Sequence, residues 1–270
     1  MKHRPGIAGV LLAVAFVAGP GAYGFDHEYL SYAKLLSEHV HVVAVDYTAL
    51  KEHRAALSKV MAECAEATAD EERSWSRDER LAFWINAYNL FTLRAIVDHY
   101  PIRSPLLTWQ PRNSIRQIDG VWTKLTWQAA GRTLTLDEIE HKVLRPEFKE
   151  PRVHFAINCA SVGCPPLAAV PYRAATLEGQ LDAAARGYLA RAQGLQIRGD
   201  TLAVSRILEW YGEDFVASFA PEAAAKPDRL ERVARAVVAR FGPPAAVDLA
   251  RKPSTRIKFL DYDWSLNDVK

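Results

Sequence analysis

Apolar residues recur with helical spacing along most of the chain after residue 25, and this pattern predicts a largely helical protein. The clearest helix spans 77–99, because Ser76 and Glu79 have the spacing of a capping box and Pro101 follows the last turn. The acidic stretch 70–77 before it is predicted to be a solvated connection. The other expected helices lie at 29–40, 48–69, 136–146, 177–192, 207–219 and 228–241.

Short extended segments are predicted where turn signals interrupt the helical pattern. Residues 42–46 form one such piece. From Ser114 onward, turns at Asp119–Gly120 and at Gly131 indicate a small antiparallel ribbon, and Gly199–Asp200 marks a further hairpin. Helices packed on a small antiparallel sheet fit this order best. The fold class is therefore predicted to be α+β, in a single domain covering residues 25–270.

A further strand is predicted at 153–157, where large apolar side chains alternate with smaller or polar ones. His154 and Asn158 would project from one face of this strand, and Cys159 would stand at its end. Loops at strand ends often display reactive groups, because the rigid strand positions what the loop exposes. The loop after Cys159 is thus a candidate for chemistry.

The first 24 residues have the layout of a secretory signal peptide. Basic residues precede an apolar run at 7–18, and the small residues Ala22 and Gly24 occupy the positions expected before a cleavage site. The apolar run is shorter than the roughly 20 residues that span a bilayer. We therefore expect cleavage after Gly24 and an exported protein, periplasmic or secreted, with no stable membrane anchor.

Charge and motif content exclude several classes of partner. The chain has 34 basic and 32 acidic residues, and removing the signal peptide, which contains Lys2, Arg4 and no acid, leaves equal numbers of basic and acidic groups. A neutral chain without basic runs has no general attraction for nucleic acid, so no such partner is expected. The chain also lacks a glycine-rich phosphate loop, a dinucleotide fingerprint and a serine nucleophile elbow, and no cofactor is predicted.

Two buried stretches carry polar side chains that need partners. In FWINAYN (83–89), Asn86 and Asn89 lie three residues apart on one helix face among large apolar neighbours. They either hold an irregular loop against the helix or line a site. In 136–145, Glu140 and His141 lie beside the apolar face, with Arg145 one turn further on. His141 is open to three roles: general base, metal ligand or hydrogen-bonded structural residue.

The three cysteines do not suggest a disulfide scaffold. Cys64 lies on the apolar stripe of a helix and is expected to be inert. Cys159 and Cys164 are open to three interpretations: a disulfide favoured by an oxidising compartment, two zinc ligands together with His154 or His141, or a Cys159 nucleophile activated by a histidine. The histidines lack a compact paired spacing, so no metal site is predicted.

Four blocks in order along the chain resemble one known family. FWINAYN, EIEHKVLR, HFAINCASVGCPPL and DYDWSLN are similar to the successive signature blocks of the domain-of-unknown-function family 547, over about residues 80–267. The family carries no established reaction. The resemblance implies a domain found in exported bacterial proteins and, joined to coiled-coil segments, in plant proteins. The matching polar positions are Asn86, Asn89, Glu140, His141, Arg145, His154, Asn158, Cys159, Cys164, Asp263 and Trp264.

We expect these groups to converge on one cleft, because buried polar groups without partners cost about 1–3 kcal/mol each. The function expected is then a cysteine-dependent hydrolase or acyltransferase acting on an amide or ester of a small molecule or peptide. Cys159 would attack the carbonyl, and His141 or His154 would carry the proton, oriented by a residue such as Glu140. The expected substrate-binding residues are Asn86, Asn89, Asn158 and Arg145, with Asn86 or Asn158 donating to the oxyanion.

A non-catalytic binding module is the alternative. In that case a Cys159–Cys164 disulfide would stiffen the loop, and the polar groups would recognise a ligand. The order of a polar helix followed by a histidine-bearing sheet also has a distant likeness to papain-like and transglutaminase-like enzymes. That likeness is one of broad plan only, because Asn86 stands where those enzymes place their cysteine.

Overall fold

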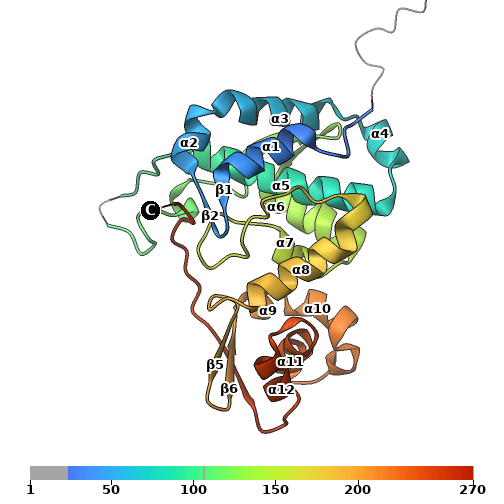
Figure 1. Ribbon diagram of the computed structural model, residues 1–270, viewed down its shortest axis with the longest axis vertical. Helices are drawn as coiled ribbons and strands as arrows, with labels where there is room; N and C mark the ends of the chain where they lie inside the picture. Colours follow the sequence, from blue (N-terminus) through green and yellow to red (C-terminus); the bar gives the residue numbers. More distant parts are fainter. Residues whose placement is uncertain (1–23, 106, 270) are drawn as a thin grey trace, which may run out of the picture.

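The computed structural model describes residues 24–105 and 107–269, so the predicted signal peptide lies outside the described residues except for Gly24. Helices make up most of the regular structure in this region, three small sheets are also present, and turns and loops connect them, which confirms the α+β class (Figure 1). Among these residues, no helix combines the length and apolar character needed to cross a bilayer. The α-helices are α1 (Leu30–His39), α2 (Tyr47–Glu52), α3 (Arg54–Glu66), α4 (Ala69–Ser74), α5 (Arg77–His99), α6 (Leu136–Glu138), α7 (Val153–Ala156), α8 (Leu177–Leu189), α9 (Ile207–Trp210), α10 (Gly212–Phe219), α11 (Arg229–Phe241) and α12 (Pro244–Ala250).

Three short 3-10 turns and one π-helix complete the helical segments, and seven strands form the sheets. The further helical segments are η1 (Ile115–Gln117), η2 (Ile139–Phe148, the π-helix), η3 (Ala174–Thr176) and η4 (Pro221–Ala223). The strands are β1 (Val40–His41), β2 (Ala44–Val45), β3 (Thr126–Ala129), β4 (Arg132–Thr135), β5 (Leu195–Arg198), β6 (Thr201–Val204) and β7 (Arg256–Phe259).

Helix α5 forms the centre of the first of two hydrophobic clusters. Its predicted capping box is present, since the Ser76 side chain accepts from the Glu79 amide and the Glu79 carboxylate accepts from the Ser76 amide. Every residue from Leu81 to Val97 except Arg94 is buried. Helices α2 and α3 and the π-helix η2 pack against α5. The helix predicted at 77–99 is confirmed, and its burial on all sides explains the dense apolar sequence.

The second hydrophobic cluster lies in the C-terminal part of the chain, around α8 to α12 and the sheet β5–β6–β7. The hairpin predicted at Gly199–Asp200 is confirmed: β5 and β6 pair antiparallel across a turn in which Gly199 has φ 61°. Strand β7 adds to β6 in parallel. Figure 1 shows this second cluster below the helices that surround α5.

The predicted solvated connection at 70–77 is wrong in part, since most of its residues are exposed but the segment is not an irregular connection. Most of it is helix α4, which begins with a capping box between Thr68 and Glu71. Glu72 on this helix is 1% exposed and binds Arg80 and Arg132 at 2.8 and 3.3 Å. Burial alone would raise the pKa of Glu72, but these arginines and the Trp84 indole lower it overall. The acidic sequence reflects a buried ion pair as well as a solvated surface.

Two further predictions were wrong in part. The expected turn at Asp119–Gly120 does not join two strands, because the residues before it form the 3-10 turn η1; only the turn at Gly131 connects a hairpin, β3–β4. The helix predicted to end at Pro146 continues to Phe148 in the π-helical geometry of η2. The wider turn of a π-helix has a different hydrogen-bond pattern, and Pro146 lies within it.

The strand predicted at 153–157 is also wrong. Residues Val153–Ala156 form one helical turn, α7, and the chain becomes extended only at Ile157. All of these residues are buried, because Phe155 belongs to the second hydrophobic cluster while Val153, Ala156 and Ile157 belong to the first. The alternation in the sequence thus reflects burial between two clusters rather than the two faces of a strand.

Candidate functional site

A cleft of about 290 Å³ lies where the two hydrophobic clusters meet, and residues from distant parts of the chain line it. Helix α5 contributes Tyr88, and the segment around α9 contributes Trp210 and Tyr211. Four of the residues expected to act in catalysis from the sequence line this cleft together: Glu140, His141, His154 and Cys159.

The loop from Asn158 to Pro165 fixes the position of Cys159. The Asn158 side chain accepts from the Ala160 amide at 2.8 Å and donates to the Pro165 carbonyl at 2.7 Å, so one side chain closes the loop. Ala160 has φ 56°, a left-handed conformation that costs an alanine about 1 kcal/mol. Strain of this kind next to a reactive group is typical of functional sites.

The C-terminal segment packs directly on this loop. The Val162 amide donates to the Ser265 carbonyl, and the Gly163 amide donates to the Asp263 carbonyl, each at 2.8 Å. A side chain at Gly163 would place its Cβ 2.9 Å from the Asp263 nitrogen, so glycine is required for this approach. The contact brings Tyr262 and Trp264 to Cys159, although they lie more than 100 residues away in sequence.

Cys159 is half-buried, and three polar groups surround its sulfur. The Cys164 Sγ lies at 2.9 Å, the Ser161 Oγ at 3.2 Å and the Tyr262 hydroxyl at 3.3 Å. Hydrogen bonds from Cys164, and then from Ser161 and Tyr262, outweigh the effect of burial and lower the pKa of Cys159 to about 7. A substantial fraction of this thiol is therefore a thiolate at neutral pH, and the thiolate is the reactive form.

The pKa of Cys164 shifts in the opposite direction to that of Cys159. Cys164 is buried, and burial together with the neighbouring Cys159 raises its pKa well above the ordinary range. Its sulfur accepts from the Cys159 amide at 3.0 Å. Both thiols are free in the structure, so the disulfide considered from the sequence is not formed there. Cys164 serves instead as a neutral thiol that can donate a hydrogen bond to the Cys159 thiolate.

The two histidines of the cleft are joined by a continuous polar network. Asp214 on α10 accepts from His154 Nε2 at 2.7 Å and from Arg145 through two bonds of 2.6 and 2.9 Å. Arg145 Nη1 also lies 2.6 Å from His141 Nδ1. Burial would raise the pKa of Asp214, but His154 and Arg145 hold it well below its usual range. Asp214 is therefore a carboxylate that orients the whole network.

The two histidines differ in access. The His141 side chain is 39% exposed and has the Asp137 carboxylate 3.5 Å from Nε2. The His154 side chain is 1% exposed, stacks on Tyr211 with ring centroids 3.9 Å apart, and leaves Nδ1 without a hydrogen-bond partner. Within the described residues, no hydrogen bond joins either histidine to Cys159. Only His141 is open to a ligand in the cleft.

Glu140 is a buried carboxyl group at the base of this arrangement. One of its oxygens lies 3.4 Å from the Tyr88 hydroxyl, and the other has no hydrogen-bond partner in the described part of the chain. As the sequence indicated, Glu140 and His141 do not pair with each other; His141 contacts Arg145 and Asp137 instead. Glu140 therefore lines the cleft with one carboxyl oxygen, Oε1, that has no hydrogen-bond partner in the described residues.

The asparagines of α5 hold backbone segments rather than line the cleft. Asn86 donates to the Tyr172 carbonyl at 2.8 Å and accepts from the Tyr172 amide at 2.9 Å. Asn89 donates to the Ala156 carbonyl at 3.0 Å and accepts from the Asn158 amide at 2.8 Å. Asn86 thus fixes a distant loop, and Asn89 fixes the segment that leads into Cys159.

Comparison with known proteins identifies one family. Residues 72–189 match the model of a family described as a protein of unknown function, DUF547. The chain carries a DUF547 domain. No curated protein and no solved structure matches it. The family match therefore supports the resemblance seen in the sequence, and it assigns no reaction.

The DUF547 match contains Cys159 and both histidines, but several residues of the cleft lie beyond residue 189. Tyr262 belongs to this second group, and Asp214, which binds His154 from outside the cleft, also lies beyond the match; neither was identified from the sequence. No local pattern marks them, because Asp214 meets His154 across 60 positions and Tyr262 meets Cys159 across 103. The block DYDWSLN was the one available signal, since it contains Tyr262.

The structure also bears on the zinc interpretation of the DUF547 cysteines. Cys159 and Cys164 do not gather with a histidine into a group of three potential ligands anywhere in residues 24–105 and 107–269. A tetrahedral zinc site needs at least three ligands within bonding distance of one ion. In the described residues, the two cysteines are thus not accompanied by the histidine ligand that the zinc interpretation requires.

Proposed function

We propose that this DUF547 protein is a cysteine-dependent hydrolase or acyltransferase that acts on an amide or ester. The observation that carries the proposal is the environment of Cys159, whose half-buried sulfur faces a cleft and is bound by two hydroxyl groups and a thiol. These donors stabilise the thiolate and lower the pKa of Cys159 to about 7. A nucleophile in this state needs no general base before it attacks.

In the proposed reaction, the Cys159 thiolate attacks the carbonyl carbon and forms a tetrahedral alkoxide. The alkoxide collapses and the bond to the amine or alcohol breaks. The imidazolium form of His141, whose Nδ1 carries a proton once the Arg145 guanidinium has moved off it, gives its Nε2 proton to that leaving group. Water then attacks the thioester, passes a proton back to His141, and the Cys159 thiolate departs. An acceptor alcohol or amine in place of water gives acyl transfer.

His141 is assigned as the proton carrier because it is the exposed histidine of the cleft. Arg145 and Asp137 hold its ring from two sides. His154 is assigned a positioning role, since it is buried and binds Asp214, which in turn fixes Arg145. This division of roles follows the access of each ring to a ligand.

The oxyanion needs a donor other than the asparagines expected from the sequence. The Asn86 and Asn158 amide groups donate to backbone carbonyls, at Tyr172 and Pro165. The Ser161 and Tyr262 hydroxyls, by contrast, lie beside the Cys159 sulfur within the site. We assign them to the alkoxide, because preorganised donors are most effective where charge develops.

The walls of the cleft indicate the kind of substrate. Trp210, Tyr262 and Trp264 pack ring against ring. The Arg116 guanidinium lies 4.7 Å from the centre of the Trp264 ring, and within the described residues no carboxylate pairs with it. Aromatic walls favour a flat or apolar group, and an unpaired guanidinium favours a carboxylate. A small molecule or peptide with both features is the proposed substrate.

The site of action is proposed to be the periplasm or the outside of the cell. This part of the proposal rests on the basic, apolar and small residues in order along 1–24. The near-neutral charge of the remaining chain gives no general attraction for a nucleic acid, so a nucleic acid is not proposed as the substrate. Cleavage after Gly24 leaves the proposed mature protein without a membrane anchor.

Labelling with iodoacetamide tests the nucleophile. At pH 7 we expect one thiol to react much faster than the others, and mass spectrometry should place the label on Cys159. Cys159→Ala should lose the fast label and keep a melting temperature close to that of the wild type. Cys64→Ala is the matched control. It should keep the fast label, because Cys64 is buried and its pKa is raised to about 12, so this thiol does not contribute to fast labelling. A fast label on another cysteine would contradict the proposal.

A binding module with a Cys159–Cys164 disulfide is the second candidate, favoured by the 2.9 Å between the two sulfurs. A small movement of either side chain would allow a bond of about 2.05 Å to form on oxidation. A thiol count on exported, unreduced protein separates the two functions. Three free thiols support the enzyme, and a single buried thiol, Cys64, supports the module.

A further inference from the structure

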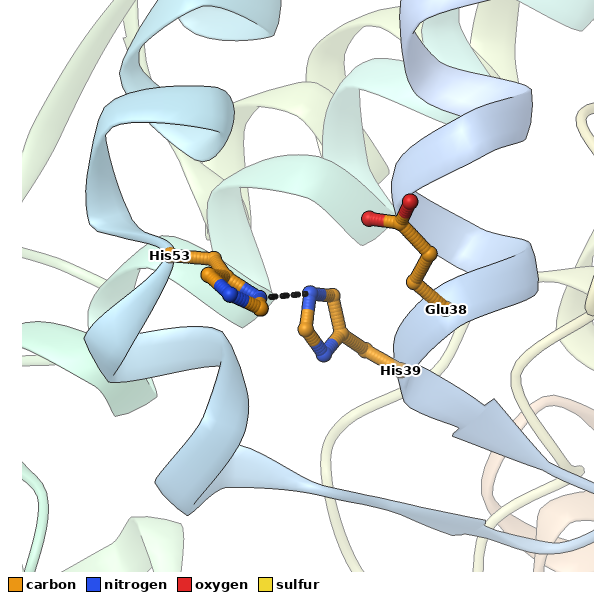
Figure 2. Close-up of side chains that lie close together, drawn as sticks. All are labelled: Glu38, His39 and His53. Atoms are coloured by element: carbon orange, nitrogen blue, oxygen red, sulfur yellow. Dashed lines mark hydrogen bonds between the residues drawn. The ribbon is translucent and has the colours of Figure 1, made fainter.

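A second group of chemically active side chains lies on the other side of the first hydrophobic cluster, at the junction of α1 with α2 and α3. It consists of Glu38, His39 and His53, whose ligand atoms all lie within 4.8 Å of one another. Figure 2 shows the two imidazole rings facing each other and the Glu38 carboxylate above them. None of the three lines the cleft around Cys159.

The contact between the rings has the dimensions of a metal site. His39 Nε2 and His53 Nδ1 lie 3.3 Å apart and share a hydrogen bond, whose proton a metal ion would replace (Figure 2). Two nitrogens bound to one zinc ion at about 2.0–2.1 Å in tetrahedral geometry are separated by roughly 3.3–3.4 Å. The rings therefore already stand at the spacing that a shared ion requires, and the Glu38 carboxylate offers an oxygen as the third ligand.

The backbone around the site also favours a cation. His39 is the last residue of α1, and His53 directly follows α2. The C-terminal end of a helix carries partial negative charge, which favours a cation at His39; His53 is both the C-cap of α2 and the N-cap of α3, so the two helix ends there offset each other. His39 is 2% exposed, so its ring is held in place by the core, while His53 and Glu38 are open to solvent. One fixed ligand and two adjustable ones can close around an ion without refolding.

The other charged groups nearby do not block the site. Lys34 lies 3.9 Å from the Glu38 carboxylate, with its side chain 77% exposed, so it can swing away into water. Glu52 and Lys59 line the same hollow, and their charges offset each other. A surface ion pair such as Lys34–Glu38 contributes about 0–1 kcal/mol and is easily exchanged for a metal bond.

We propose that Glu38, His39 and His53 form a binding site for a zinc ion. The ligand atoms are His39 Nε2, His53 Nδ1 and one Glu38 oxygen, and water completes the tetrahedron. Two imidazoles and a carboxylate are a ligand set that zinc accepts. The bound ion links the end of α1 to the α2–α3 junction, which places its effect on the stability of the N-terminal helices.

Zinc titration of metal-free protein by calorimetry tests the site. We expect one zinc ion per chain with micromolar affinity and a melting temperature that rises with zinc. His53→Ala and Glu38→Gln should each weaken binding at least tenfold; both residues are exposed, so these variants should fold normally. His41→Ala is the matched control, an exposed histidine two residues from His39 that should bind zinc as the wild type does.

Cobalt substitution identifies the ligands directly. At this site, cobalt should give the visible bands of a tetrahedral ion without sulfur-to-cobalt charge transfer, and His53→Ala should abolish the bands. A charge-transfer band that disappears in Cys159→Ala would place the ion at the cysteines and overturn the proposal. Absence of zinc binding, or binding that His53→Ala leaves unchanged, would overturn it as well.

Discussion

A His141→Ala variant is expected to release about one nitrophenolate per chain from para-nitrophenyl acetate and then to turn over about 10²–10⁴ times more slowly than the wild type. The first step survives because the Cys159 thiolate attacks unaided and nitrophenolate leaves without a proton. The second step slows because water attack on the thioester needs a base. Stopped-flow absorbance separates the burst from the steady state.

Three comparisons make this result decisive. Cys159→Ala should show no burst, and His41→Ala, another exposed histidine, should behave as the wild type. His154→Ala should lower the free energy of unfolding, because it removes a buried ring and leaves the partly buried Asp214 carboxylate with one partner fewer. Equal turnover in His141→Ala and the wild type would remove His141 from the mechanism, and the absence of a burst in His141→Ala, where thioester hydrolysis is slowed, would contradict a thioester intermediate.

An Asn89→Ala variant is expected to lose roughly 2–6 kcal/mol of stability. Asn89 is 2% exposed, and its side chain satisfies both the Ala156 carbonyl and the Asn158 amide. Alanine would leave these two buried backbone groups without partners, and each would then cost about 1–3 kcal/mol. Urea unfolding at pH 7, followed by circular dichroism, measures the difference.

Asn113→Ala is the control for this substitution. Asn113 is exposed, so its replacement should change the free energy of unfolding by less than about 0.5 kcal/mol. A loss of less than about 1 kcal/mol in Asn89→Ala would mean that water replaces the asparagine, and the structural role assigned to this side chain would be wrong. Because Asn89 holds the segment before Cys159, its loss should also slow the labelling of that thiol.

Local signals account for the parts of the fold that could be predicted from the sequence. The capping box at Ser76 and Glu79 and the proline after His99 define α5 without reference to any other segment. The Gly199–Asp200 turn likewise encodes its own hairpin, because glycine readily adopts the positive φ found there. Such features depend on a few neighbouring residues, and tertiary contacts do not override them.

Two of the incorrect predictions share a different cause, which is contact with residues far away in the sequence. Residues 153–157 alternate like a strand, but two hydrophobic clusters contact them, and no neighbouring strand is present in the described region to pair with them. The acidic stretch at 70–77 looked solvated, yet Glu72 points inward to Arg80 and Arg132. In both cases the deciding partners lie outside the local segment.

The same distinction applies to the candidate site. Cys159, His141 and His154 could be singled out because polar residues interrupt apolar stretches of the sequence. Their bonding partners Asp214 and Tyr262 could not, since each pairing joins segments that only the folded chain brings together. The sequence therefore indicated the reactive groups, while the groups that tune and orient them required the structure.

The pH dependence of Cys159 alkylation tests the central claim most directly. The rate of iodoacetamide labelling at Cys159, followed by mass spectrometry from pH 5 to 10, reports the fraction of thiolate. Because hydrogen bonds to the sulfur lower the pKa, the rate should rise with pH to a midpoint of about 7, and Tyr262→Phe should move that midpoint upward. A midpoint at or above the usual thiol value of about 8.5, unchanged in Tyr262→Phe, would contradict an activated nucleophile.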